Sequence, residues 1–239
     1  MIKKIQFSCP KEYLLLKEDY PEPIKLNIPK WFKKLSNSIE KNTIKKCMPF
    51  LETLTTGYLL KIPKDLYIEH NKIDDAGIRV SNIKTRKFNT DEEFNLNNGQ
   101  TPHGVDQIKG SPLLNKNLNF DVHKIMNPWV IKTPPGYSCL FVSPLNNSDD
   151  RFSIVSGIVD TDTYEGQINF PIIFNGDKYP VLNTTLTKGT PYAQIIPFKR
   201  DNWSMEIKEN KHIKSFNLKF ILNNVLFYKE KIWSKRIWK

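Results

Sequence analysis

Two carboxylates and a tyrosine follow a short apolar run in residues 156–170, SGIVDTDTYEGQINF. The apolar pair before Asp160 places this carboxylate at the end of an expected strand. There it can orient a water molecule or accept a hydrogen bond from a ribose hydroxyl, while Tyr164 can stack on a base or pack against its sugar. Gly166 would allow close approach of the backbone. The same residues also suit a β-hairpin in which Asp162 caps the turn, so a binding site and a plain turn are both consistent with this stretch.

A polar side chain also stands within an apolar run nearer the end of the chain. Gln194 lies in residues 186–198, LTKGTPYAQIIPF, between an alanine and two isoleucines. A buried amide needs hydrogen-bond partners. Those partners are either a ligand or a neighbouring strand, and the apolar surroundings slightly favour the structural bond.

The histidines and cysteines form no recognisable catalytic or metal-binding pattern. The spacing nearest to the H-x-D/E of a nonheme iron site is that of His103 and Asp106, which is one residue too long. The three cysteines are widely spaced and form no C-x-x-C pair, so we expect reduced thiols. Cys139 falls in an expected strand and is predicted to be a small core residue. The sequence predicts no metal site.

The elements that must position these residues are closely spaced short strands. From residue 128 onward, β-rich runs fall at residues 129–132, 138–142, 152–159, 167–174, 181–186 and 193–197. The segments between them contain turn-forming Pro-Pro-Gly, Asn-Gly-Asp and Lys-Gly-Thr. This spacing predicts a β-sandwich or β-barrel.

The remainder of the chain is less regular. We expect strands at residues 58–62, 66–68 and 77–87 and a long loop at about 89–119. We also expect a short helix at 31–40 and a second helix from about 213 to the end. The prolines of the first fifty residues favour extended, wrapping segments. The lysine-rich end also carries Trp233 and Trp238, which indicates a solvated helix face with the tryptophans packed on the body; nucleic-acid binding is the alternative.

Composition sets broad limits on the function. The chain has 239 residues and a net charge of +11, with 39% hydrophobic and 26% charged residues, as in ordinary globular proteins. A basic excess can indicate nucleic acid, an anionic ligand or an acidic partner. Lysine, asparagine and isoleucine also share A/T-rich codons, so genome bias explains part of the charge. No apolar run approaches the roughly 18–20 residues that span a bilayer, and no signal peptide is expected, so we expect no membrane partner.

Three ordered segments of residues 129–200 resemble the dUTPase and dCTP deaminase superfamily. WVIKTPPGYSCLFVSPLN (129–146) is similar to the strand and turn that lead into a phosphate-binding R-S-x-L element. The Asp160 segment is similar to G-x-I-D-x-D-Y-x-G-x-I, and the Gln194 segment to I-x-x-G-x-x-I-A-Q-L-I. The resemblance implies a compact β fold, a homotrimer, and ligand contacts from Ser143 and Asn146 in addition to the residues named above.

The sequence also departs from this family's pattern. Val142 occupies the position of the phosphate-binding arginine, and Pro144 removes a backbone N–H from the same element. Thr163 is an extra residue between the aspartates and Tyr164, and Pro191 replaces an arginine that often precedes A-Q. The expected C-terminal helix takes the place of a glycine-rich arm. The fold therefore carries over better than the activity.

The N-terminal region resembles uncharacterised phage-associated proteins, through PKWFKKL (29–35) and TIKKCMPFL (43–51). This resemblance implies no activity. It is consistent with the A/T-biased composition, and we expect a cytoplasmic protein, located in the host cytoplasm if phage-encoded.

We therefore expect a mainly β fold: a dUTPase-like β-barrel or sandwich core at 125–200, a β-rich N-terminal extension at 1–124 and a basic C-terminal helix at 201–239, all in one integrated domain. The preferred function is binding of a nucleotide-like or other anionic small ligand. The alternatives are a diverged nucleotide hydrolase that uses Mg²⁺, with Asp160 as base, and a non-enzymatic phage structural or interaction protein. The candidate ligand-binding residues are Ser143, Asn146, Asp162, Tyr164, Gly166 and Gln194, with Asp160 as the candidate base or ligand acceptor.

Overall fold

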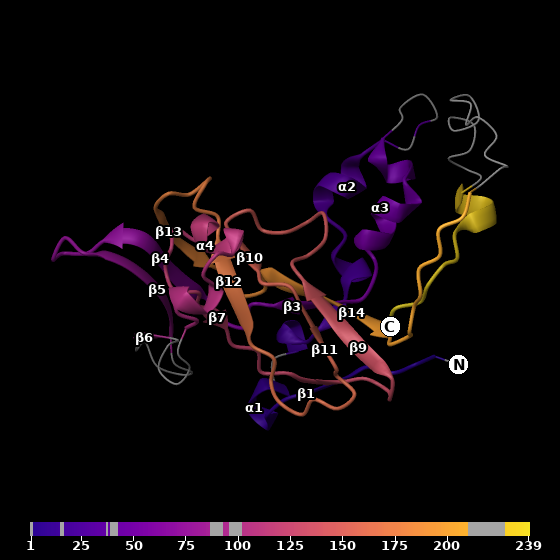
Figure 1. Ribbon diagram of the computed structural model, residues 1–239, viewed down its shortest axis with the longest axis horizontal. Helices are drawn as coiled ribbons and strands as arrows, with labels where there is room; N and C mark the ends of the chain where they lie inside the picture. The colour runs from indigo at the N-terminus through magenta and orange to yellow at the C-terminus, as the bar shows by residue number, and fades with distance from the viewer. Residues whose placement is uncertain are drawn as a thin grey trace.

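The structure is a computed structural model that describes residues 2–14, 17–36, 38, 43–86, 93–95, 102–209 and 228–239. Antiparallel strands form most of its regular structure, and the helices are short (Figure 1). The mainly β fold expected from the spacing of apolar runs is confirmed.

A five-stranded antiparallel sheet positions the candidate residues. Its strand order is β11 (Gly157–Val159), β9 (Tyr137–Val142), β14 (Pro191–Lys199), β3 (Tyr58–Lys61) and β2 (Glu22–Pro23). The central strand β14 is almost continuously apolar from Tyr192 to Ile195, and these side chains are buried. A strand paired on both edges and covered on both faces needs no polar alternation.

Three smaller sheets complete the β structure. The four-stranded sheet has the order β13 (Leu182–Leu186), β4 (Leu66–Ile73), β5 (Arg79–Arg86) and β6 (Glu93–Asn95). The three-stranded sheet joins β10 (Phe152–Ile154), β12 (Phe170–Phe174) and β7 (Lys124–Ile125), and β1 (Gln6–Ser8) pairs with β8 (Val130–Lys132). All of these pairings are antiparallel. In Figure 1 the four-stranded sheet lies at the opposite side of the molecule from the two chain ends.

One apolar core joins these sheets. It contains buried side chains from the five-stranded, four-stranded and three-stranded sheets, including Leu60, Ile68, Phe141, Ile172 and Ile195. Burial of apolar area is the main driving force for such packing. Strands from residues 1–124 and from residues 125–200 therefore share a single core.

The helices of the described residues are all short, and prolines lie at the start of three of them. The helices are α1 (Lys11–Leu14), α2 (Lys30–Lys34), α3 (Met48–Thr53) and α4 (Pro112–Lys116), with 3₁₀ turns at Lys17–Asp19, Ile24–Asn27, Ile44–Lys46 and Val105–Ile108 and a π-helical turn at Tyr228–Ile232. Pro49 and Pro112 lie in the first turns of α3 and α4, where a missing N–H costs nothing. No helix among the described residues has the length and apolarity to span a membrane.

Most expected strands are present, with shifted ends. The run at 152–159 forms two strands, β10 and β11, because Val155 and Ser156 lie between them without strand pairing. The expected loop at 89–119 is wrong for part of its length: β6, the 3₁₀ turn at Val105–Ile108 and α4 fall within it, and the positions 89–92 and 96–101 lie outside the described residues.

Two expected helices differ from the structure. The helix at 31–40 is shorter than expected: α2 ends at Lys34, and Leu35 already has an extended backbone with ψ of 143°. Positions 213–227 of the C-terminal helix lie outside the described residues, and residues 233–239 contain no helix. Residues 233–239 instead contact the body of the protein, where Trp233 and Arg236 both donate to the Glu52 carboxylate. Tertiary contacts of this kind can override local propensity.

Candidate functional site

Asp160 begins the turn that follows β11. Strand pairing sets Val159 opposite Cys139, so the next residue emerges beside Ser138. Ser138 Oγ donates a hydrogen bond to Asp160 Oδ1 over 2.6 Å, and the Tyr164 N–H donates to the Asp160 carbonyl over 2.9 Å. The Asp160 side chain is nevertheless 60% exposed. The carboxylate is therefore held by the fold and is still open to solvent.

Arg200 completes this cluster from the end of β14. Its Nη1 lies 3.2 Å from Asp160 Oδ1, 2.8 Å from Asp162 Oδ1 and 3.1 Å from Ser138 Oγ. Pairing of Lys199 with Tyr137 brings Arg200 beside the turn before β9, where its N–H donates to the Gly136 carbonyl over 2.9 Å. Sequence reasoning missed both Arg200 and Ser138. Only the register of β14 against β9 reveals them.

The Asp162 carboxylate stabilises the turn and is not placed to bind a ligand. Its side chain is only 6% exposed, and both of its oxygens are engaged, by the Arg200 guanidinium and by the Gly136 N–H at 2.8 Å. The hydrogen bonds from Arg200 and then the bond from the Gly136 N–H lower the pKa of Asp162 to about 2. Asp162 therefore fixes the segment 160–166 against the turn before β9.

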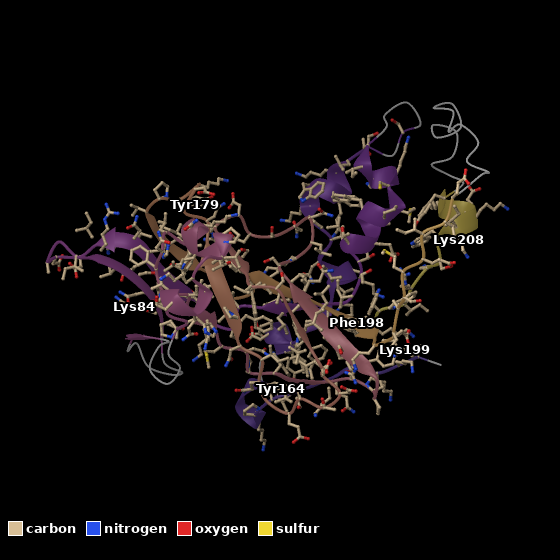
Figure 2. The ribbon with its side chains drawn as sticks, viewed as in Figure 1. Lys84, Tyr164, Tyr179, Phe198, Lys199 and Lys208 are labelled. Atoms are coloured by element: carbon tan, nitrogen blue, oxygen red, sulfur yellow. The ribbon has the colours of Figure 1, made fainter. Side chains whose placement is uncertain are left out.

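Tyr164 presents an aromatic side chain at the surface of this turn. It is 44% exposed, and its hydroxyl donates to the Gln167 carbonyl over 3.3 Å (Figure 2). Its ring lies over Gly166, where an added Cβ would come within 2.7 Å of the tyrosine oxygen. A side chain at position 166 would therefore displace the Tyr164 ring from this position. Asp160 and Tyr164 remain accessible, as does the Arg200 side chain at 36% exposure. We call the segment 160–166 the Asp160 turn.

The remaining candidate residues belong to a different part of the sheet. Gln194 is fully buried. Its Oε1 accepts from the Leu145 N–H over 2.8 Å, and its Nε2 donates to the carbonyls of Thr53 and Thr56 over 3.1 and 2.8 Å. The amide connects β14, the end of α3 and the loop after β9, which is the structural arrangement that the apolar surroundings favour.

Ser143 and Asn146 lie in that same loop. Ser143 Oγ accepts from the Ile154 N–H over 3.0 Å, and the Asn146 amide donates to Thr53 Oγ1 over 2.8 Å. They line a hollow of about 580 Å³. Among the described residues that line it, the polar members are serines and Asn146, and none is charged. Position 142 holds valine where the resembled family has a phosphate-binding arginine. No other cation among the described lining residues of this hollow replaces it.

The two groups of candidate residues lie at opposite ends of the same strands. Asp160 and Arg200 lie beside the start of β9, whereas Gln194 and Ser143 lie at its other end (Figure 1). Gln194 and Lys199 are five positions apart in β14, which corresponds to roughly 17 Å at the usual rise of a strand. One protomer does not bring Asp160 together with the Ser143–Asn146 loop.

Ser81 lies between two buried histidines elsewhere in the described chain: its Oγ is 2.7 Å from His70 Nδ1 and 3.2 Å from His123 Nε2. No group of three or more His, Cys, Asp or Glu side chains in the described part of the chain could hold a metal ion. His103 Nδ1 lies 2.7 Å from Gln107 Oε1. Cys139 is fully buried, which raises the pKa of its thiol to about 11, so its expected place in the core is confirmed.

Comparison with known proteins yields structural matches only. No protein-family model matches the chain, and neither does any curated protein. The dUTPase of EIAV is 17% identical, with a TM-score of 0.34; the match covers 66% of this chain and 87% of that one. The dUTPase of phage phi11 of S. aureus is 19% identical, with a TM-score of 0.27 and coverage of 40% and 76%.

A mutant dUTPase of Staphylococcus bacteriophage 80alpha, solved with dUpNHpp, is 17% identical over 41% of this chain and 70% of that one, with a TM-score of 0.28. These are dUTPases, the class of protein that the motifs of residues 129–200 resemble. The chain is similar to them in part of its fold.

Proposed function

We propose that this protein binds a nucleotide-like small ligand at the Asp160 turn. The observation that supports this most directly is the state of Asp160. Ser138 and Arg200 fix its Oδ1, while the carboxylate as a whole stays 60% exposed. A polar group that is held in place yet open to solvent loses little conformational entropy when it binds.

The accessible groups suit the uncharged part of such a ligand. The Asp160 carboxylate keeps acceptor capacity for a ligand hydroxyl or N–H, because Ser138 and Arg200 both contact its Oδ1. The exposed ring of Tyr164 can pack against a sugar or a base. Sugar hydroxyls and base N–H groups, together with a flat ring, are the features of a nucleoside.

Hydrolysis of a nucleoside triphosphate finds less support than binding. The hollow at Ser143 has no charged lining residue among those described, and the positive charge of Arg200 is shared between two carboxylates. A Mg²⁺ ion prefers several oxygen ligands in octahedral geometry. Both oxygens of Asp162 are already engaged, so the cluster does not fit a protein-built magnesium site.

The resemblance to dUTPases further implies a homotrimer. Since one protomer separates Asp160 from the Ser143–Asn146 loop, only a second copy could bring such a loop to the Asp160 turn. Native mass spectrometry of the purified protein reports the number of copies and any ligand that is carried through purification. A monomer without ligand would remove this part of the proposal.

Calorimetric titration with deoxynucleosides and deoxynucleotides, with and without Mg²⁺, tests the binding itself. We expect saturable binding that Asp160→Asn weakens about tenfold, as expected when one hydrogen bond to a charged acceptor is lost. Glu165→Gln is the matched control, because Glu165 lies in the same turn with its side chain 88% exposed. Equal loss in both variants, or no binding by the native protein, would overturn the proposal; turnover of a triphosphate would favour the hydrolase instead.

A further inference from the structure

A second cavity lies where the two ends of the chain meet. It has a volume of about 720 Å³, and its walls come from residues 2–6, the turn before β9, β3, β14 and residues 236–239. Figure 1 shows the two ends at the same side of the molecule. Its size falls within the range of small-molecule sites. None of the residues of the Asp160 turn lines it.

The C-terminal tail forms a fixed wall of this cavity. The Tyr58 hydroxyl donates to the Lys239 carbonyl over 3.1 Å, and the rings of Tyr58 and Trp238 meet edge to face at 5.9 Å. Arg236 donates to the Glu52 carboxylate over 2.8 Å. Polar, ionic and aromatic contacts thus all hold the tail against β3 and α3.

The lining combines aromatic surface with positive charge. Tyr58, Tyr137 and Trp238 supply rings, and four basic residues line the same space: Lys3, Lys4, Arg236 and Lys239. Lys3 Nζ lies over the Tyr137 ring, 4.8 Å from its centre. No side chain of the described residues that line the cavity is acidic, and the Tyr58 hydroxyl holds the main-chain oxygen of Lys239.

Most of this charge is not neutralised by the protein. Arg236 is paired with Glu52, whereas Lys4 and Lys239 make no ion pair with any described residue. Like charges gathered around a partly apolar space attract an anion and repel a cation. The aromatic walls favour a ligand whose body is flat and apolar.

The cavity adjoins the Asp160 turn but shares no lining residue with it: Thr133 lines the cavity, and its Oγ1 lies 2.8 Å from Thr161 Oγ1 of the turn. Successive side chains of a strand point to opposite faces. Tyr137 lines the cavity, and its neighbour Ser138 contacts Asp160 on the other face of β9. Binding at one of these places therefore does not require the other.

We propose that this cavity is a binding site for an organic anion with an aromatic body. The phosphate, sulfonate or carboxylate of the ligand lies against Lys4 and Lys239, and its ring lies against Tyr58 and Tyr137. This proposal does not depend on the proposed function of the Asp160 turn. It also gives part of the chain's positive charge a specific role.

The test uses 1-naphthyl phosphate as the probe and isothermal titration calorimetry as the readout. Two further compounds separate the parts of the recognition: 1-naphthol keeps the ring without the charge, and inorganic phosphate keeps the charge without the ring. We expect 1:1 binding of 1-naphthyl phosphate, and at least about tenfold weaker binding of the other two. Affinity should fall as salt is added, because the attraction is partly Coulombic.

Lysine substitutions in the cavity and elsewhere on the protein test where 1-naphthyl phosphate binds. The double variant K4Q/K239Q should weaken the binding of 1-naphthyl phosphate about tenfold or more, since two unpaired charges are removed. K4R/K239R should restore it. K25Q/K109Q removes two exposed lysines elsewhere and should have no effect. An unchanged melting temperature of K4Q/K239Q shows that the fold is intact.

Three results would overturn the proposal: no saturable binding of 1-naphthyl phosphate, equal binding of 1-naphthol, or the same affinity in K4Q/K239Q as in K25Q/K109Q. Asp160→Asn provides the separation from the proposed function. It should leave the affinity for 1-naphthyl phosphate unchanged, whatever it does to the binding of nucleosides.

Discussion

The Arg200 guanidinium binds the Asp162 carboxylate in a two-pronged contact, with Nη1 at 2.8 Å from Oδ1 and Nη2 against Oδ2. This pair joins the end of β14 to the turn after β11. Paired, planar geometry of this kind is the strongest form of a charged hydrogen bond. The neighbouring Asp160 is thereby placed at the surface in a defined position.

Asp162→Asn should lower stability at neutral pH, with a melting temperature lower by a few degrees. The hydrogen bonds from Arg200 and Gly136 lower the pKa of Asp162 from its usual 3.8 to about 2. A lowered carboxyl pKa stabilises the fold above the unfolded value, and this contribution is lost as the pH falls from about 3.8 toward 2.

The check is urea denaturation of both proteins at a series of pH values. The difference in the free energy of unfolding should be constant down to about pH 4 and then shrink. A difference that does not change with pH would show that the charge of Asp162 is unimportant. Glu165→Gln, in the same exposed turn, serves as the control.

His70 should make the protein less stable in weak acid. Burial is the main reason that the pKa of His70 lies near 4, below its usual 6.5, and the nearby His123 lowers it further. Between these two values the unfolded chain binds a proton that the folded protein does not, so stability is complete above pH 6.5 and falls as the pH drops toward 4. His70→Phe should flatten this decline, and His103→Phe, at a less buried position, should leave it unchanged.

Gln194→Ala should destabilise the protein by about 3 kcal/mol. Truncation leaves the Leu145 N–H and the carbonyls of Thr53 and Thr56 without their partner in a buried place. Gln167→Ala is the matched control, because that amide is exposed, and it should cost less than about 0.5 kcal/mol. Equilibrium unfolding in urea measures both. Equal costs would contradict the structural role of Gln194.

Gly57 and Gly77 provide a test of close packing. Both have a positive φ, of 82° and 78°. An added Cβ at Gly57 would lie 2.0 Å from the Ile195 carbonyl oxygen of β14, whereas nothing lies within 4 Å of one at Gly77. Gly77→Ala should cost only the backbone penalty of about 1 kcal/mol, and Gly57→Ala at least about 3 kcal/mol. Thermal unfolding of both variants gives the comparison; similar melting temperatures would contradict the close approach.

Cys139 should be the slowest thiol to react. It is fully buried with a raised pKa, whereas Cys9 and Cys47 are partly exposed. Since the thiolate is the reactive form, an aromatic disulfide reagent at pH 8 should label Cys139 only as the protein unfolds. Cys139→Ala should therefore retain the fast phases of labelling and lose the slowest one. Fast labelling of all three thiols in the native protein would contradict the buried position.

The turn formers and short apolar runs predicted the β architecture well, because local pattern sets where strands begin and end. They also predicted the buried place of Cys139. The helix expected at 31–40 is too long, since α2 ends at Lys34, and residues 233–239 form no helix where Trp233 and Arg236 bind Glu52. The structure of such segments depends on contacts with residues that are distant in the sequence.

Local patterns of residue type and spacing are enough to single out Asp160, Tyr164 and Gln194 as polar side chains beside strands. Their surroundings depend on how distant strands pair. The antiparallel register of β9 and β14 brings Arg200 to Asp160 and carries Gln194 to the opposite end of the sheet. Residues 2–6 and 236–239 likewise line one cavity although they lie far apart in the sequence. Such pairings depend on contacts between segments far apart in the chain, which periodicity within a segment does not encode.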